Sequence, residues 1–190
     1  MKFFRTMRLI ELERIIEGFG RIRIARKIKI TDNQLKRAEA HYGELKDKIL
    51  NGSITKGQGN IYGALGEIIV HDLYQKVYEV KFENNYDYDL VIDGDRVDVK
   101  TKRTTVKPSS NYNCSISAFN TRQKCDFYVF VRITEDKRTA YVLGYKKKKA
   151  FFKQAVFGKK GEVDPDGNGT WVFKDDCYNL KIKKLKQTIF

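Results

Sequence analysis

A short apolar segment, residues 90–92, and an alternating segment, residues 95–102, flank the dipeptide Asp93-Gly94. Alternation with a period of two is typical of half-buried β-strands. Asp-Gly is one of the dipeptides that best accept the positive φ angles of a two-residue type I′ turn. The sequence therefore predicts a β-hairpin of defined register. The predicted pairs are Ile92 with Asp95, Val91 with Arg96, and Leu90 with Val97.

The same register places Asp89 directly opposite Asp98, so that two carboxylates share one site. Like charges that face each other across a strand pair destabilise the sheet. A divalent cation, which prefers oxygen ligands, would offset this repulsion, and Lys100 on the same face would add a positive charge. The alternative is an exposed polar face on which Arg96 and Lys100 screen the two acids.

Helical patterns lie on both sides of a glycine-containing loop. Thr31 and Gln34 have the spacing of a capping box and predict a helix over residues 32–50. A second helix is predicted over residues 61–78, where two glycines suggest close packing on a sheet because glycine is costly inside a helix. Shorter helices are predicted over residues 5–17 and 150–157.

The longest nearly continuous apolar run, residues 126–133, predicts a buried strand. Residues 21–30 alternate basic and apolar side chains, which suits either a strand with a basic face or an irregular helix. Residues 115–123 are ambiguous. Further strands are predicted over residues 77–82, 139–144 and 170–173, with a basic edge strand over residues 178–185.

The charge of the chain favours a polyanionic partner. Its 190 residues include 38 Lys and Arg against 24 Asp and Glu, which gives a net charge of +14. No apolar run approaches the roughly 20 residues of a membrane span, and the N-terminus lacks a signal-peptide pattern. We therefore expect a soluble, intracellular protein of the cytoplasm or nucleoid that has no membrane partner.

Cysteine and histidine usage argues against two other kinds of site. The three cysteines form no C-x-x-C pair, so neither a disulfide framework nor a zinc knuckle is indicated. His41 and His71 are the only histidines and lie far apart in the sequence, which makes a histidine-rich metal site unexpected. No motif for an organic cofactor is present. The cysteines are Cys114, Cys125 and Cys177.

The acidic hairpin resembles a known motif. Asp89, followed by Asp98-Val99-Lys100, is similar to the PD-(D/E)XK nuclease motif, in which an acid precedes an (Asp/Glu)-x-Lys strand. Glu67, in the predicted helix upstream, matches the glutamate that often joins the site in that family. Tyr88 stands where the motif name has proline. The resemblance covers about residues 60–145.

The resemblance implies an α/β fold with a restriction-endonuclease-like core, in which helices flank a central mixed β-sheet. Residues 56–190 would form this core with a C-terminal β-hairpin, and residues 1–55 a basic, helical N-terminal extension. The implied cofactor is Mg²⁺ or Mn²⁺, and Lys100 would orient the attacking water and favour its deprotonation. The implied metal ligands are Asp89, Asp98, the main-chain carbonyl of Val99, and Glu67.

Basic and polar residues near this site are candidates for contacts with nucleic acid. They comprise a glycine-containing loop before the second helix, the residues just beyond the implied catalytic lysine, a pair before the buried strand, and part of a run of four lysines. The candidates are Lys56, Gln58, Asn60, Lys102, Arg103, Arg122, Gln123, Lys146 and Lys147.

The expected function is therefore metal-dependent hydrolysis of phosphodiester bonds in DNA by an endonuclease, either restriction-like or junction-resolving. Many such enzymes cut two strands with two subunits, so a homodimer is expected, and a phage or other mobile element is a plausible source. The alternatives are an RNA-directed nuclease and a non-catalytic nucleic-acid-binding protein on the same fold. The non-catalytic protein would bind nucleic acid whether or not Mg²⁺ is present.

Overall fold

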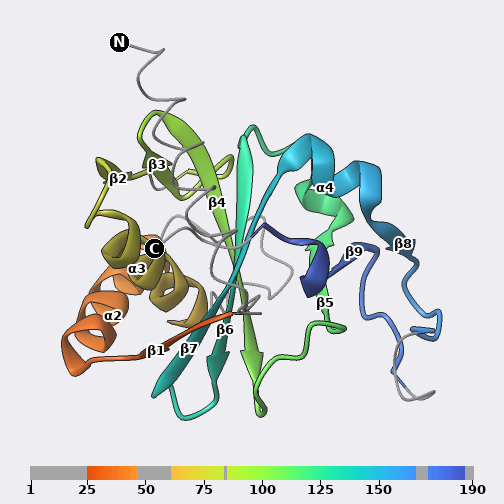
Figure 1. Cartoon of the computed structure of the whole chain (residues 1–190), viewed down its shortest axis with the longest axis horizontal. Helices are drawn as coiled ribbons and strands as arrows, with labels where there is room; N and C mark the ends of the chain where they lie inside the picture. Colours follow the sequence, from red (N-terminus) through yellow and green to blue (C-terminus); the bar gives the residue numbers. More distant parts are fainter. Residues whose placement is uncertain (1–24, 47–60, 84, 166–170, 187–190) are drawn as a thin grey trace, which may run out of the picture.

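The computed structural model describes residues 25–46, 61–83, 85–165 and 171–186, and Figure 1 shows their arrangement. The first predicted helix, the predicted domain boundary and the loop with Lys56, Gln58 and Asn60 lie outside these ranges. The elements are β1 (Arg26–Lys29), α2 (Asp32–Lys46), α3 (Ile61–Tyr74), β2 (Val80–Phe82), β3 (Leu90–Ile92), β4 (Asp95–Thr104), β5 (Asn113–Ser117), the 3-10 helix η1 (Ala118–Arg122), β6 (Phe127–Thr134), β7 (Thr139–Lys147), α4 (Lys148–Gln154), β8 (Val156–Gly158), β9 (Cys177–Lys181) and the 3-10 helix η2 (Ile182–Lys184).

A mixed six-stranded sheet forms the centre of the molecule, so the predicted α/β class is confirmed. Its strand order is β1-β7-β6-β4-β3-β2, in which β4 and β6 are parallel and every other neighbouring pair is antiparallel. A second sheet has three strands in the order β5-β9-β8. Within the described residues, no helix is long and apolar enough to cross a membrane.

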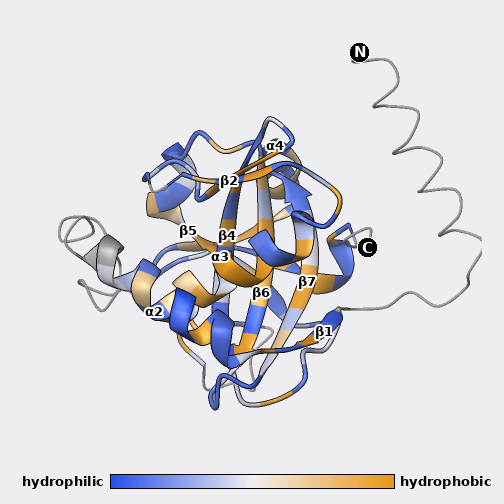
Figure 2. Cartoon of the chain, turned by 90° about the vertical axis from the view of Figure 1, so that its left-hand side faces the viewer, coloured by the Kyte–Doolittle hydropathy of each residue, from blue (hydrophilic) through white to orange (hydrophobic). Residues whose placement is uncertain are grey.

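The central sheet is covered on both faces. Helices α2 and α3 lie on one side of it in Figure 1, and α4 with the second sheet lies on the other. Each face has its own hydrophobic cluster. Val97, Val99 and Val131 pack with the helices, whereas Tyr128 and Phe130 pack with α4 and the second sheet. In Figure 2, α3 crosses in front of β4 and β6, and its ribbon is coloured largely hydrophobic.

The hairpin forms as the sequence predicts. Asp93 and Gly94 have φ angles of 55° and 91°, as a type I′ turn requires. All three predicted residue pairs are present between β3 and β4. The predicted register is therefore confirmed for these three pairs, whereas Asp89 lies just before β3 and is not part of the paired ladder.

Close approach of α3 to the sheet is confirmed at one of its two glycines. A Cβ atom on Gly66 would lie 1.9 Å from Oγ1 of Thr101 on β4, so only glycine fits there. A Cβ atom on Gly63 would meet nothing within 4 Å, and the prediction of close packing is wrong at that position. Gly66 thus allows α3, which carries Glu67, to lie close to β4, which carries Asp98 and Lys100.

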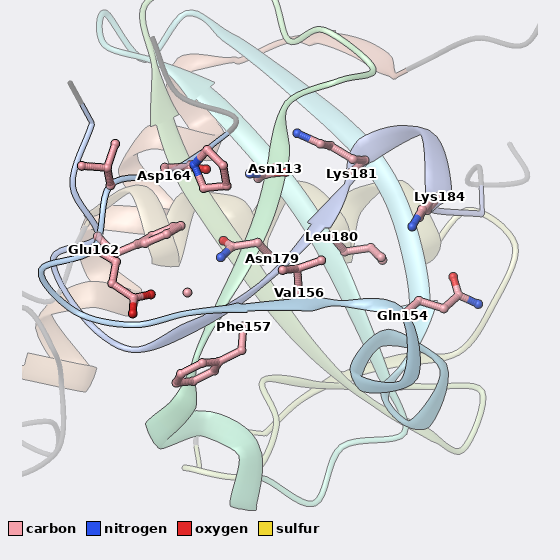
Figure 3. A pocket seen from close by; sticks show the side chains of 14 residues that line it. Asn113, Gln154, Val156, Phe157, Glu162, Asp164, Asn179, Leu180, Lys181 and Lys184 are labelled. Atoms are coloured by element: carbon pink, nitrogen blue, oxygen red, sulfur yellow. The ribbon is translucent and has the colours of Figure 1, made fainter. Parts of the chain in front are cut away.

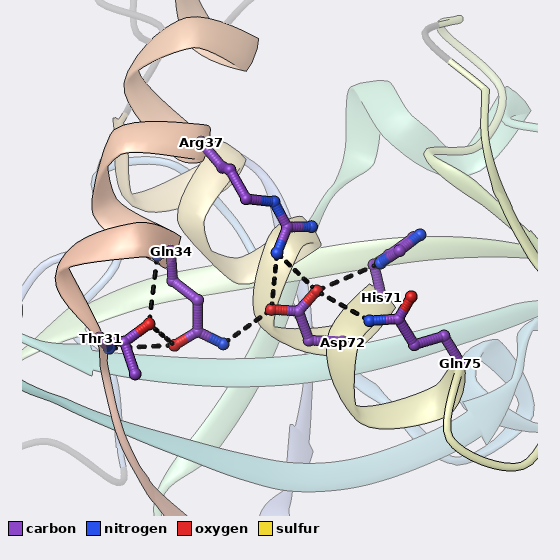
Figure 4. Close-up of polar contacts among 6 residues, drawn as sticks. All are labelled: Thr31, Gln34, Arg37, His71, Asp72 and Gln75. Atoms are coloured by element: carbon purple, nitrogen blue, oxygen red, sulfur yellow. Dashed lines mark hydrogen bonds and ion pairs between the residues drawn. The ribbon is translucent and has the colours of Figure 1, made fainter.

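A polar cluster joins α2 to α3 (Figure 4). The capping box is confirmed, because the Gln34 backbone N–H donates to Oγ1 of Thr31 and the Thr31 backbone N–H donates to Oε1 of Gln34. The amide of Gln34 also donates to Asp72 at 2.9 Å, and the guanidinium of Arg37 donates to both oxygens of Asp72. The cap of α2 is therefore also a contact between helices.

Residues 25–46, the described part of the predicted N-terminal extension, pack with the central sheet. β1 pairs with β7 at the edge of that sheet and exposes its lysines while Ile28 contacts the core. The strand alternative for residues 21–30 is thus the one observed over Arg26–Lys29. Helix α2 packs on α3, and the two form one layer on this face of the sheet.

Several predicted elements differ from those observed. The helix predicted over residues 150–157 ends at Gln154, because Val156–Gly158 pairs with β9. The predicted basic edge strand is wrong, since β9 ends at Lys181 and is the central strand of the second sheet. In the described part of residues 170–173, Val172 forms only an isolated bridge to Val163. The second helix ends at Tyr74, β2 begins at Val80, and the ambiguous segment is β5 followed by η1.

Candidate active site

Asp98, Lys100 and Gln123 form a closed set of polar contacts at the base of the hairpin. Asp98 is only 2 % exposed, and its Oδ2 lies 2.6 Å from Nζ of Lys100. The amide nitrogen of Gln123 donates to Oδ1 of Asp98 at 2.7 Å, and Nζ of Lys100 donates to Oε1 of Gln123 at 3.2 Å. Gln123 therefore bridges the acid and the lysine.

The backbone around Gln123 holds this bridge in place. Gln123 follows η1, within the connection that crosses from β4 to the parallel strand β6. Its amide nitrogen also donates to the carbonyl oxygen of Tyr86 at 2.8 Å, and the ammonium of Lys148 donates to its main-chain oxygen. Gln123 is 5 % exposed, so its side chain is directed at the carboxylate and not at solvent.

Asp89 lies beside this set, just before β3. Its Oδ2 accepts a 2.6 Å hydrogen bond from the Val99 backbone N–H. Burial raises the pKa of the Asp89 carboxyl well above its usual range, and the negative charges of Glu67 and Asp98 raise it further. Lys100 and the Val99 hydrogen bond act in the opposite direction. The charges of Glu67 and Asp98 therefore raise the pKa of Asp89 by more than the charge of Lys100 lowers it.

Glu67 reaches this region from α3 and has a partner on α2. Its Oε2 lies 2.8 Å from Nε2 of His41, and both side chains are largely buried. Glu67 is therefore a largely buried acid whose partner is a histidine. The ring of His41 also lies 5.1 Å from that of Phe82, on which His71 stacks at 4.4 Å.

Lys100 is the positive charge among these acids. Burial alone would lower the pKa of its ammonium group, but the charges of Asp98 and Asp89 raise the pKa above its usual value. The group is therefore held as a cation while the carboxylates are ionised. Its ammonium also lies 5.9 Å from the centre of the Tyr128 ring.

The donor chemistry of this cluster suits a hard divalent cation. Carboxylate oxygens are the ligands that Mg²⁺ prefers, and the charges of Glu67 and Asp98 add to burial in raising the pKa of Asp89. Within the described residues, no three His, Cys, Asp or Glu side chains are arranged as a group that could hold a metal ion. Each acid instead has an internal partner. These partners are His41 for Glu67, the Val99 N–H for Asp89, and Lys100 with Gln123 for Asp98.

The candidate nucleic-acid contacts are dispersed around this site. Arg103 forms an exposed ion pair with Glu135 at 3.2 Å, and Arg122 is exposed at the end of η1. The Lys146 ammonium donates to Gln154 and to the main-chain oxygen of Lys184. Lys147 lies over the ring of Phe127, and Lys102 lies over that of Trp171.

A pocket of about 370 Å³ lies apart from the carboxylates, within the second sheet (Figure 3). Its lining includes Asn113, Asn179, Lys181 and Lys184 and none of the acids described above. Sequence patterns did not indicate this pocket, because it forms between short strands that are distant in the sequence.

His41 is the residue at the site that sequence reasoning missed. The only signal in the sequence was a histidine on α2, the helix before the one that carries Glu67. That signal points to no particular partner unless the packing of α2 on α3 is known. Gln123 was expected to contact nucleic acid, whereas the structure directs it to Asp98 and Lys100. Comparison of the chain with models of known protein families and with curated proteins gives no match.

Proposed function

We propose that the protein is a metal-dependent nuclease with a restriction-endonuclease-like core, and that it hydrolyses phosphodiester bonds in DNA as an endonuclease. One observation carries the proposal. The negative charges of Glu67 on α3 and of Asp98 on the hairpin both raise the pKa of Asp89, and Lys100 lies in contact with Asp98. A structural role alone gives no reason to gather one buried acid, Asp98, and two partly buried acids, Asp89 and Glu67, because like charges destabilise the fold.

In this proposal Asp89, Asp98, Glu67 and the main-chain carbonyl of Val99 hold Mg²⁺ or Mn²⁺. The bound cation neutralises charge that develops on the phosphate and makes water more acidic. Lys100 orients the attacking water and stabilises negative charge on it, since its ammonium is kept protonated by the neighbouring acids. Gln123 keeps Asp98 and Lys100 in register with each other.

The proposed substrate follows from charge. A net charge of +14 favours a polyanion, and contacts of lysine and arginine with phosphates would release counterions. A homodimer would let two such sites cut two strands. The proposed setting is inside the cell, with a phage or other mobile element as a source.

The test is incubation of the purified protein with supercoiled plasmid, linear duplex, single strands and a four-way junction, each with Mg²⁺, Mn²⁺ or EDTA. We expect cutting that needs the metal and is lost in Asp98→Ala and in Lys100→Ala. Glu39→Ala is the matched control, because Glu39 is an exposed acid on α2 away from the site. Normal cutting by Asp98→Ala would exclude the proposal.

A non-catalytic binding protein is the second candidate, and the internal partners of the three acids favour it. Glu67, Asp98 and Asp89 each already have an internal partner, in His41, Gln123 and a backbone N–H, and none of these contacts requires a cation. This candidate predicts that nucleic acid binds equally well with and without Mg²⁺, and equally well to Asp98→Ala. RNA would then be tested in the same assay.

A further inference from the structure

Trp171 is an exposed aromatic residue with two positive charges close to its ring. It is the only tryptophan in the sequence, and it is 49 % exposed. The ammonium groups of Lys102 and Lys174 each lie 5.8 Å from the centre of its ring. An exposed indole beside two cations offers an aromatic surface and positive charge to the same ligand.

Lys102 connects Trp171 to the candidate active site. It lies two residues after Lys100 on β4, and alternation along the strand places both side chains on one face of the sheet. The distance between these two positions along the strand is roughly 7 Å. A ligand held at Trp171 and Lys102 would therefore lie on the same face of β4 as Lys100.

A second cation lies beside Lys102. Arg132 is its neighbour in the parallel pairing of β4 with β6. Burial lowers the pKa of both groups, and the charge of Arg132 lowers that of Lys102 further. Within the part of the chain that the structure describes, neither Lys102 nor Lys174 forms an ion pair with an acid. Their charge is thus available to an anionic ligand.

We infer that Trp171 stacks on a base of single-stranded nucleic acid, while Lys102 and Lys174 bind the flanking phosphates. Every base has an aromatic face, but in a duplex these faces are covered by neighbouring base pairs. An exposed indole therefore selects unpaired bases, and cations beside it bind the strand by charge. The inference deepens the proposed function, on which it rests for its ligand, by assigning an unpaired strand to this site.

The intrinsic fluorescence of the chain tests this inference, because every tryptophan photon comes from Trp171. The full-length protein is titrated with oligo(dT), and separately with a duplex of the same length, in EDTA. We expect saturable quenching by oligo(dT) and much weaker quenching by the duplex. Unchanged fluorescence at oligo(dT) concentrations that saturate binding by anisotropy would overturn the inference, as would equal quenching by the duplex.

Variants provide an independent measurement with labelled oligo(dT) and anisotropy. We expect Trp171→Ala to weaken binding roughly tenfold and Trp171→Phe to keep most of the affinity, since stacking is worth about that much per base. Phe157→Ala is the matched control, because Phe157 is 47 % exposed and packs edge-on against Tyr178 in the same lobe. Wild-type affinity in Trp171→Ala would contradict the inference.

The two lysines make a further prediction about salt. We expect Lys102→Ala and Lys174→Ala each to reduce the slope of log affinity against log salt concentration by about 0.7. All these measurements exclude metal and record binding, so they are separate from cleavage. If the protein cuts plasmid but oligo(dT) does not quench Trp171 fluorescence, the proposed function stands and this inference is wrong. If oligo(dT) quenches Trp171 fluorescence but no DNA is cut, this inference stands and the proposed function is wrong.

Discussion

The amide nitrogen of Gln123 lies 2.7 Å from Oδ1 of Asp98 and donates a hydrogen bond to it. The amide oxygen of the same side chain accepts from Nζ of Lys100. One neutral side chain thus fixes the orientation of both Asp98 and Lys100, because an amide group carries an N–H donor and an oxygen acceptor side by side. In the proposed nuclease, this makes Gln123 a positioning residue.

Loss of this bridge should affect the rate of cleavage and leave affinity unchanged. We expect Gln123→Ala to lower the cleavage rate at saturating DNA at least tenfold, since Asp98 and Lys100 lose their common partner. Affinity for DNA in EDTA should stay within about twofold of wild type. Lys124→Ala, at an exposed neighbouring position, is the control and should cut normally. A Gln123→Ala enzyme with the wild-type rate would show that the bridge is only structural.

Divalent cations should stabilise the folded protein if the acids bind them. A cation that binds the native state alone raises the free energy of unfolding by RT ln(1 + [L]/Kd), which is about 2.7 kcal/mol at a hundredfold excess over Kd. We expect Mg²⁺ or Mn²⁺ to raise the melting temperature of the wild type and to have much less effect on Asp89→Asn. Calorimetry with and without EDTA measures both. Equal shifts in the two proteins would mean that the cation binds elsewhere.

Packing of α3 on β4 should tolerate no side chain at Gly66. We expect Gly66→Ala to destabilise the fold by about 1–3 kcal/mol, because its methyl group would overlap Thr101. Thr101→Ala should recover part of this loss, since Oγ1 of Thr101 is buried without a hydrogen-bond partner among the described residues. Gly63→Ala is the matched control and should be neutral or stabilising by up to about 1 kcal/mol. Urea unfolding of the wild type, Gly66→Ala, the double variant Gly66→Ala/Thr101→Ala and Gly63→Ala measures these differences.

Acid should weaken the contact between α2 and α3. Burial tends to raise the pKa of Asp72, but hydrogen bonds from Gln34, Arg37 and His71 outweigh it and lower the pKa below 3.8. A pKa lowered by folding contributes stability above the unfolded value, and that contribution is lost as pH falls through the folded value. We expect Asp72→Asn to cost about 1 kcal/mol near neutral pH and to lose less stability than wild type below about pH 4.

Chemical denaturation at several pH values measures this difference. Glu39→Gln, an exposed change of the same charge on α2, should follow the wild-type curve. Parallel curves for Asp72→Asn and wild type would refute the linkage.

Features set by neighbouring residues were predictable from the sequence. The register of the hairpin follows from Asp93-Gly94, whose two positive φ angles leave one way to pair the flanking strands. The capping box of Thr31 and Gln34 is likewise a contact across one helical turn. Asp89 and Asp98 were brought together for the same reason. In each case the geometry depends on a few bonds of local chain.

Features set by distant pairing were not predictable. The second sheet joins β5 to β9 and β8, and its short strands carry no period that distinguishes them from loops or helix ends. Residues 156 and 157 were predicted as the end of a helix, yet Val156–Gly158 pairs with β9, because tertiary contacts outweigh local propensity. His41 and His71, distant in the sequence, both contact Phe82. The roles of His41 and Gln123 depend on such packing.

The chain order of the sheet has a consequence for how the protein folds. β1 pairs with β7 through Arg26 and Val142, and β5 pairs with β9 through Asn113 and Lys181, so much of the native structure waits on contacts between remote segments. Such topologies fold slowly, in roughly milliseconds to seconds. The hairpin is local and can form early, which brings Asp89 and Asp98 together before Gln123 arrives on its crossover. Repulsion between the carboxylates of Asp89 and Asp98 would then slow formation of the hairpin. We expect Asp98→Asn to remove this repulsion and to increase the refolding rate.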